Sequence, residues 1–145
     1  MNKEKFFNLI YLYIKNQDTA TKMEIISIAE KHPMWLITPT SDKSIWNTCA
    51  KILIELKYEI IKKNLPHILE YYQDINWPGA DVITRYLTNI PKEDLIVAIT
   101  EVLPLAANDD FWLFGLVSLM VATDTIKVFQ SIDKYNKLIK KSDYF

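Results

Sequence analysis

Residues 65–78 read LPHILEYYQDINWP, and they predict a helix, a four-residue turn and the start of a second helix. Proline is tolerated in the first turn of a helix, where its missing N–H has no partner to lose, so Pro66 and Pro78 each mark a helix start. Asn76 is expected to cap the second helix with its side-chain oxygen. Trp77 is expected to staple the turn to the core. The stretch therefore predicts a pair of antiparallel helices.

The rest of the chain repeats its apolar residues at the helical spacing of about 3.6 and not at the alternation of strands. The sequence holds only two glycines and no Asn-Gly or Asp-Gly dipeptide, the residues on which tight hairpins of a sheet depend. Caps and prolines divide the chain into about seven or eight helices. The expected segments are 3–16, 21–32, 42–56, 65–73, 78–89, 91–103, 111–121 and 124–141.

An Asp-x-x-Trp pattern with a small residue three positions after the Trp occurs twice, 35 residues apart. The two copies are Asp74, Trp77 and Ala80, and Asp109, Trp112 and Gly115. A period of this length, with two helices in each unit, is typical of stacked helical pairs of the HEAT or tetratricopeptide kind. The sequence therefore favours an all-α fold of stacked antiparallel helix pairs, a short HEAT-like solenoid, over an ordinary helical bundle.

The length of 145 residues fits a single domain, because common domains hold roughly 100–150 residues. A chain of this length buries about 68–70% of its unfolded surface and needs neither disulfides nor a metal to fold. Within one domain spanning 1–145, three parts are expected. They are an additional N-terminal helix pair over 1–40, a helical repeat core over 42–121 and a C-terminal helix over 122–145.

Two patterns resemble a family of small bacterial HEAT-like helical domains of unknown function. They are the turn Asp74-Ile75-Asn76-Trp77-Pro78 and the downstream helix start Asn108-Asp109-Asp110-Phe111-Trp112, with Leu103-Pro104 between them. The resemblance covers roughly residues 42–120, and residues 1–40 lie outside it. In such domains Ala often follows the Pro directly, whereas Gly79 intervenes here. The resemblance implies a helical fold and supplies no activity, since the family is itself uncharacterised.

The chain shows no constellation of residues that predicts catalysis. Cys49 stands among apolar residues at helical spacing, which predicts a buried structural thiol and not a nucleophile. His67 and Glu70 share one helix face, but with no third ligand they predict a solvated pair and not a metal site. No Gly-rich phosphate loop, nucleophile elbow or zinc-type pairing occurs. We expect a protein that is not an enzyme and has no cofactor or metal.

One cysteine permits no intramolecular disulfide, which suits a reducing compartment. No apolar stretch approaches the roughly 20 residues of a membrane span, and no small-residue cleavage site follows the apolar N-terminal segment. The expected location is the cytoplasm, away from membranes.

Acidic residues gather in the middle of the chain. From His67 to Trp112 there are eight acids and two bases, a net charge of −6, whereas 1–66 carry +3 and 113–145 carry +2. Helix capping and solubility explain part of this charge, because anions are favoured in first helical turns. The other interpretation is a partner-binding surface. Its candidate residues are Glu70, Asp74, Trp77, Asp81, Asp109 and Asp110.

The four tryptophans are expected in different surroundings. Trp46 and Trp112 fall on apolar helix faces and are predicted to be core residues. Trp77 is open to two interpretations, as a core residue or as the anchor of a groove. Trp35, in a loop between two prolines, is the tryptophan expected to be exposed.

The leading functional hypothesis is a non-catalytic protein-binding module with an acidic face, and specifically an immunity protein for a bacterial toxin that attacks nucleic acid. Such toxins carry basic active sites that an acidic helical scaffold can block. One rival is a HEAT-like nucleic-acid-binding or base-excision domain, which would need a basic concave face that the middle of this chain lacks. Another is a structural accessory protein or homodimer. The oligomeric state is not predicted.

Overall fold

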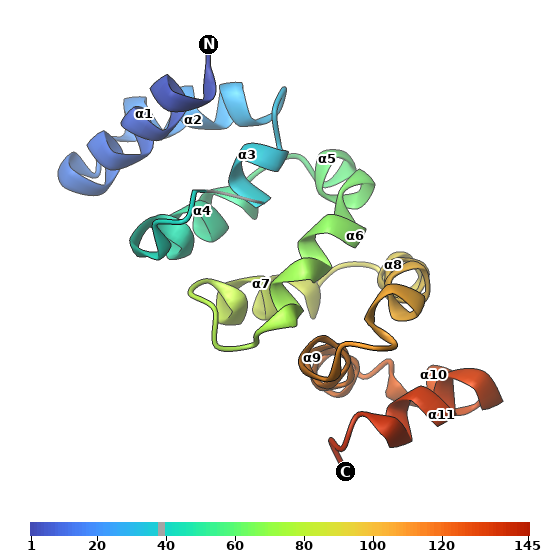
Figure 1. Ribbon diagram of the computed structural model, residues 1–145. Coiled ribbons are helices and arrows are strands. Elements are labelled where there is room, and N and C mark those ends of the chain that lie inside the picture. The colour runs from blue at the N-terminus through green and yellow to red at the C-terminus, as the bar shows by residue number, and fades with distance from the viewer. Residues whose placement is uncertain (38–39) are drawn as a thin grey trace. The chain divides into compact units, whose positions relative to one another are not determined.

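The computed structural model describes residues 1–37 and 40–145. This part of the chain forms eleven α-helices and two 3-10 helices and contains no strand, which confirms the all-α prediction (Figure 1). None of the helices described is long and apolar enough to cross a membrane. The contacts divide the chain into two compact units, Met1–Asn64 and Leu65–Phe145. The single-domain and solenoid expectations stay predictions.

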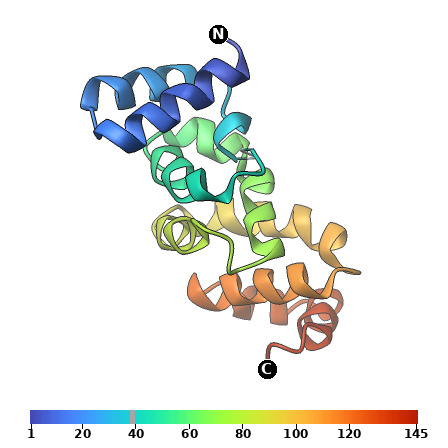
Figure 2. The same ribbon diagram turned by 60° about the vertical axis from the view of Figure 1, so that its left-hand side comes forward.

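The first unit is built on the antiparallel pair of α1 and α2, which lie side by side in Figure 2. Its elements are α1 (Lys3–Asn16), α2 (Thr19–Ala29), α3 (Met34–Ile37), η1 (Lys43–Ile45), α4 (Trp46–Leu53) and α5 (Tyr58–Lys63). The side chains of Asn2 and Asp18 cap the first two helices by accepting backbone N–H groups. The buried core of this unit includes Phe6, Ile10, Ile25, Leu36, Ile45, Cys49, Leu53 and Ile61.

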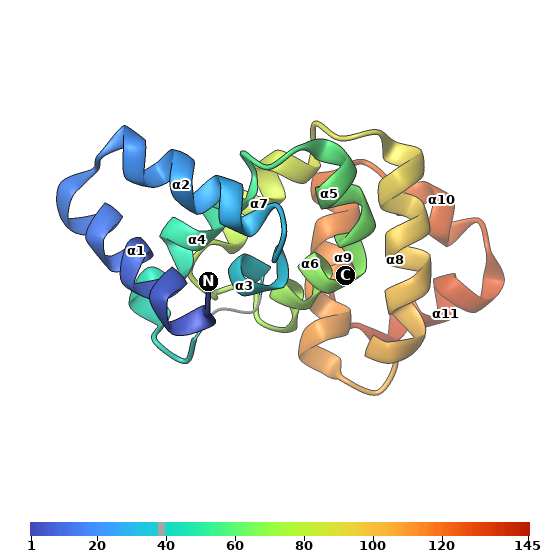
Figure 3. The same ribbon diagram turned by 90° about the horizontal axis from the view of Figure 1, so that it is seen from above.

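The second unit holds the longest helix of the described chain, α8, beside α9 (Figure 3). Its elements are α6 (Leu65–Ile68), η2 (Leu69–Gln73), α7 (Ala80–Leu87), α8 (Lys92–Ala106), α9 (Asp110–Ala122), α10 (Ile126–Gln130) and α11 (Asp133–Lys141). Asp109 caps α9, as expected, by accepting the N–H of Trp112 at 3.1 Å. The core includes Leu69, Ile83, Ile99, Leu103, Leu113, Leu116, Val117 and Phe129.

The turn after η2 differs from the prediction. Helix α7 begins at Ala80 and not at Pro78, and its N-cap is Gly79 with φ 96°. Asn76 does not cap it, because Gly79 holds the N-cap position and no side chain caps this helix. The backbone N–H of Asn76 donates to Asp74 Oδ1 at 2.9 Å. Glycine adopts the left-handed region without steric cost, so Gly79 turns the chain at the point where the family resemblance led us to expect alanine.

The structure has more helices than the predicted seven or eight. Helix α3 lies in the expected loop after Pro33, α5 follows the expected third helix, and three expected helices are interrupted. Segment 42–56 becomes η1 and α4, segment 65–73 becomes α6 and η2, and segment 124–141 becomes α10 and α11. Apolar spacing does not detect the 3-10 segments η1 and η2, since a short 3-10 turn keeps side chains on nearly the same face.

Helix α9 packs most extensively against η2, and two residues set this contact. The indole N–H of Trp112 donates to the Leu69 carbonyl at 3.1 Å in a buried position. One turn later Gly115 faces the Tyr72 carbonyl so closely that a Cβ there would overlap the carbonyl oxygen and lie 2.9 Å from the carbonyl carbon. The small residue in the second copy of the repeat, Gly115, is therefore required by this backbone contact.

We expect Gly115→Ala to destabilise the protein. The added Cβ must displace backbone, which costs about 1–3 kcal/mol, even though alanine is the better helix former by about 1 kcal/mol. Urea unfolding followed by circular dichroism measures the change. The control is Ser118→Ala in the same helix, expected to stay within about 0.5 kcal/mol of the parent. A Gly115→Ala variant as stable as the parent would contradict this account of the contact.

Candidate functional site

A groove on the second unit brings together three segments that are distant in sequence. They are the turn that follows η2, the beginning of α9 and the residues at the end of α11. Its volume is about 780 Å³, within the range of about 300–1,000 Å³ of common ligand sites. The lining residues are Gln73, Asp74, Ile75, Asn76, Trp77, Asp109, Asp110, Phe111, Phe114, Lys141, Ser142 and Asp143.

Local hydrogen bonds hold two of the carboxylates in place. Asp74 Oδ1 accepts the N–H of Asn76 at 2.9 Å, and the Asp74 carbonyl accepts the N–H of Trp77 at 3.0 Å. Asp109 Oδ1 accepts the N–H of Trp112 as the cap of α9. In each of these aspartates, one carboxylate oxygen accepts a hydrogen bond from a nearby backbone N–H. The Asp-x-x-Trp pattern is thus a capping pattern in its second copy and a tight turn in its first.

The groove is also aromatic. Phe111, the second residue of α9, is 81% exposed, which is unusual for a phenylalanine, whereas the next residue, Trp112, is buried. Phe114 is half-buried and its ring packs against Tyr144, with the ring centroids 5.2 Å apart. Trp77 is half-buried at the turn. Large apolar side chains therefore line a surface that four carboxylates share.

The charges of the groove are unbalanced. Four aspartates line it, and the one base, Lys141, donates its amine to the Ala107 carbonyl at 2.7 Å. Asp110 and Asp143 are exposed and form no side-chain hydrogen bond or ion pair with any other described residue. The formal charge of the lining is −3. An arrangement of this kind attracts cations and repels phosphates.

A comparison with family models identifies the family of the chain. Residues 40–143 match the model of a domain of unknown function, DUF5071. The chain belongs to this family. No curated protein and no solved structure matches the chain. The match begins two residues before the expected start at residue 42 and continues beyond residue 120 to include the last helices, so the groove residues up to Asp143 lie inside the family region.

Four of the six candidate binding residues meet in the groove: Asp74, Trp77, Asp109 and Asp110. The other two lie elsewhere. Glu70 lies 3.7 Å from the Nδ1 atom of His67, the pair expected from their spacing. Asp81 lies on α7, beside a second depression of the same unit.

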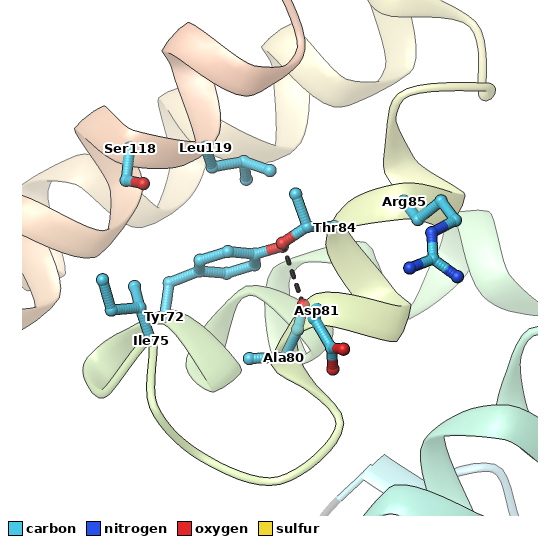
Figure 4. A pocket seen from close by; sticks show the side chains of 8 residues that line it. All are labelled: Tyr72, Ile75, Ala80, Asp81, Thr84, Arg85, Ser118 and Leu119. Carbon is cyan, nitrogen blue, oxygen red and sulfur yellow. Dashed lines mark hydrogen bonds between the residues drawn. The ribbon is translucent and has the colours of Figure 1, made fainter.

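The second depression, of about 390 Å³, is lined mainly by residues of α7 and α9 (Figure 4). Inside it the Tyr72 hydroxyl lies 2.6 Å from Thr84 Oγ1, which itself donates to the Ala80 carbonyl. The Tyr72 O–H is therefore the donor to Thr84, and burial raises the pKa of Tyr72 well above its ordinary value. The hydroxyl groups of Tyr72 and Thr84 therefore satisfy each other, and the charged lining residues of this depression, Asp81 and Arg85, are exposed.

Sequence reasoning missed Phe111, Phe114, Lys141 and Asp143. Phe111 is the hydrophobic member of the Asp-Asp-hydrophobic-Trp pattern, which predicts a helix start and does not distinguish an exposed ring from a buried one. Helical spacing alone does not separate Phe111 from Trp112, since adjacent residues of a helix point about 100° apart and a wide apolar face can bury both, as it does for Trp112 and Leu113. Asp143 follows the last helix with φ 58°, and no pattern in the sequence marks it.

The other sequence expectations have mixed outcomes. Trp112 is buried, as predicted, while Trp46 is half-buried and donates its indole N–H to the Thr40 carbonyl at 2.8 Å. The prediction that Trp35 is exposed is wrong, because its ring stacks on His32 with centroids 4.1 Å apart and contacts Phe6. Among residues 1–37 and 40–145, no three His, Cys, Asp or Glu side chains gather in a way that could hold a metal ion.

Cys49 is fully buried in the first unit, as predicted, and burial raises the pKa of its thiol to about 12. We therefore expect the folded protein to react with Ellman's reagent at pH 8 on the order of 1,000-fold more slowly than the chain in denaturing urea, because the thiolate is scarce and shielded. Release of the coloured thiol measures the rate. Reaction of the folded protein at the rate of a free thiol would contradict the burial.

Proposed function

We propose that this chain is a non-catalytic protein-binding module that recognises a basic partner protein through the groove of its second unit. The observation that supports the proposal is the meeting of four carboxylates with Trp77 and Phe111 on one surface. Buried interface hot spots are rich in aromatic side chains surrounded by polar ones, and charge complementarity speeds the encounter. Phe111 at 81% exposure is such a side chain before its partner arrives.

The partner that best fits this surface is a bacterial toxin that attacks nucleic acid, and the chain would then be its immunity protein in the cytoplasm. An enzyme that acts on nucleic acid needs lysines and arginines to hold phosphates. A surface of opposite charge competes for those side chains. A purely nucleic-acid-binding function is disfavoured, because the groove carries −3 where phosphates would have to lie.

We expect the chain to bind the basic domain encoded by the reading frame directly upstream of its own gene, and to rescue the growth of cells that express that domain. The variant D74N/D109N/D110N should lose at least about tenfold in association rate, because fewer charges steer the encounter. Asparagine caps helices as well as aspartate does, so this variant keeps the cap of α9. Stopped-flow or surface-binding kinetics measure the rate.

The matched control is D18N/D124N/D133N, which makes the same change in net charge on exposed aspartates outside the groove. Its association rate should stay within about twofold of the parent. Raising the salt from about 0.1 M to about 1 M shortens the Debye length from about 10 to about 3 Å and should slow the parent far more than the triple groove variant. Equal losses for both triple variants, or no binding to any basic protein, would contradict the proposal.

A further inference from the structure

We infer that the groove of the second unit is a binding site for an arginine side chain. The arginine belongs to a segment of the partner protein that also carries an apolar residue. This inference rests on the proposed function and specifies the chemistry that the partner must offer. It follows from three features of the groove: its free carboxylates, the aromatic side chains beside them and its volume.

The free anionic groups are at the beginning of α9 and at the end of the chain. Asp109 and Asp74 each use one oxygen for a cap or a turn, whereas Asp110 and Asp143 use none within the described residues. Lys141 is exposed but its amine is held by the Ala107 carbonyl. Carboxylates that enter one groove from different elements and have no counter-ion provide more acceptors than a single ammonium group can satisfy.

The groove combines these acceptors with aromatic surface. A guanidinium is planar, carries five donors in a fixed fork and stacks on aromatic faces, so one arginine can bind carboxylates through its edge and Phe111 or Trp77 through its plane. Lysine has no plane to stack and is more strongly hydrated. The adjoining Ile75, which is 40% exposed, and half-buried Phe114 offer apolar contact to a neighbouring side chain of the same segment.

An anionic ligand is excluded by the way α9 begins. The N-terminus of a helix attracts anions through its free N–H groups and dipole. Here Asp109 and Asp110 already occupy that position, and Asp109 takes up one of the N–H groups. A phosphate or carboxylate of a ligand would therefore meet four aspartates, whereas a cation meets no competing charge beyond Lys141.

The volume of about 780 Å³ admits a few side chains and not a folded domain, so the occupant is a short segment. A second copy of this chain would have to supply Arg85, the sole arginine in the sequence. Arg85 lies on α7 inside a regular helix and not on a protruding segment. The occupant is therefore a segment of a different protein, and self-association through Arg85 is an outcome that the test recognises.

The probe is the capped dipeptide acetyl-Phe-Arg-amide, titrated into the full-length ¹⁵N-labelled protein. We expect saturable shifts of the amide resonances of residues 74–77, 109–114 and 141–143. The citrulline analogue, which is neutral but has the same shape, should bind at least about tenfold more weakly, since it lacks the charge-assisted hydrogen bonds. The lysine analogue should bind with intermediate affinity. Equal affinity for all three dipeptides, or shifts confined to other residues, would overturn the inference.

Two variants locate the contacts. D110N/D143N removes the two free charges and F111A removes the exposed ring, and each should weaken the binding of the arginine dipeptide by about fivefold or more. The control D124N/D133N makes the same change in charge elsewhere and should leave its affinity within about twofold. All three alter exposed side chains, so unfolding midpoints should match the parent, and this is checked first. Weakening by the control alone would overturn the assignment.

The failure of this inference is distinct from the failure of the proposed function. If the basic partner binds D110N/D143N and F111A as tightly as it binds the parent, the proposed function stands and the arginine-binding site is wrong. If the arginine dipeptide binds the groove but no basic protein does, the arginine-binding site is correct and the proposed function is wrong. Sedimentation that shows dimers of the parent but not of R85A would replace the partner segment with a second copy and overturn the choice of occupant.

Discussion

The contact between η2 and α9 is the constraint on which the second unit depends. Trp112 donates its indole N–H to the Leu69 carbonyl, and Gly115 allows the Tyr72 carbonyl to approach the backbone of α9. Because both contacts are to carbonyls of one short 3-10 segment, they fix α9 relative to η2 in position and in rotation. The turn that leaves η2 and the cap that begins α9 are therefore held side by side, and these are two of the three segments of the groove.

Local backbone hydrogen bonds explain why the groove can be acidic without disturbing the fold. Asp109 and Asp74 are used by the backbone, one as a helix cap and one in a turn, so their positions follow from local structure. Asp110 adds a charge in a first helical turn, where the dipole tolerates it. Capping and partner binding were alternative interpretations of these residues, but the structure shows that they are compatible, because a capping carboxylate keeps one oxygen for another molecule.

Much of the fold and part of the groove could be predicted from the sequence, because helical spacing and helix caps are local features of a sequence. Apolar spacing and caps gave the helical class, and the twin Asp-x-x-Trp patterns marked two of the groove segments. The failures have different physical causes. Gly79 in the left-handed region moved the start of α7 past Pro78, and α6 is followed by the 3-10 segment η2, which packs against α9. Asp143 joins the groove only through tertiary packing, which no local pattern records.

Position in the fold also separates the two aromatic residues that begin α9. Phe111 and Trp112 are adjacent in the chain, but one is 81% exposed and the other 8% exposed. The buried indole anchors the helix to η2, and that anchor directs the neighbouring phenyl ring away from the core and toward the free carboxylates. Exposure of a large apolar ring costs solvation in the unbound protein, and the packing of the unit would be satisfied by a polar residue at position 111. A phenylalanine there agrees with the role of the groove that we propose, because a bound partner would cover the ring.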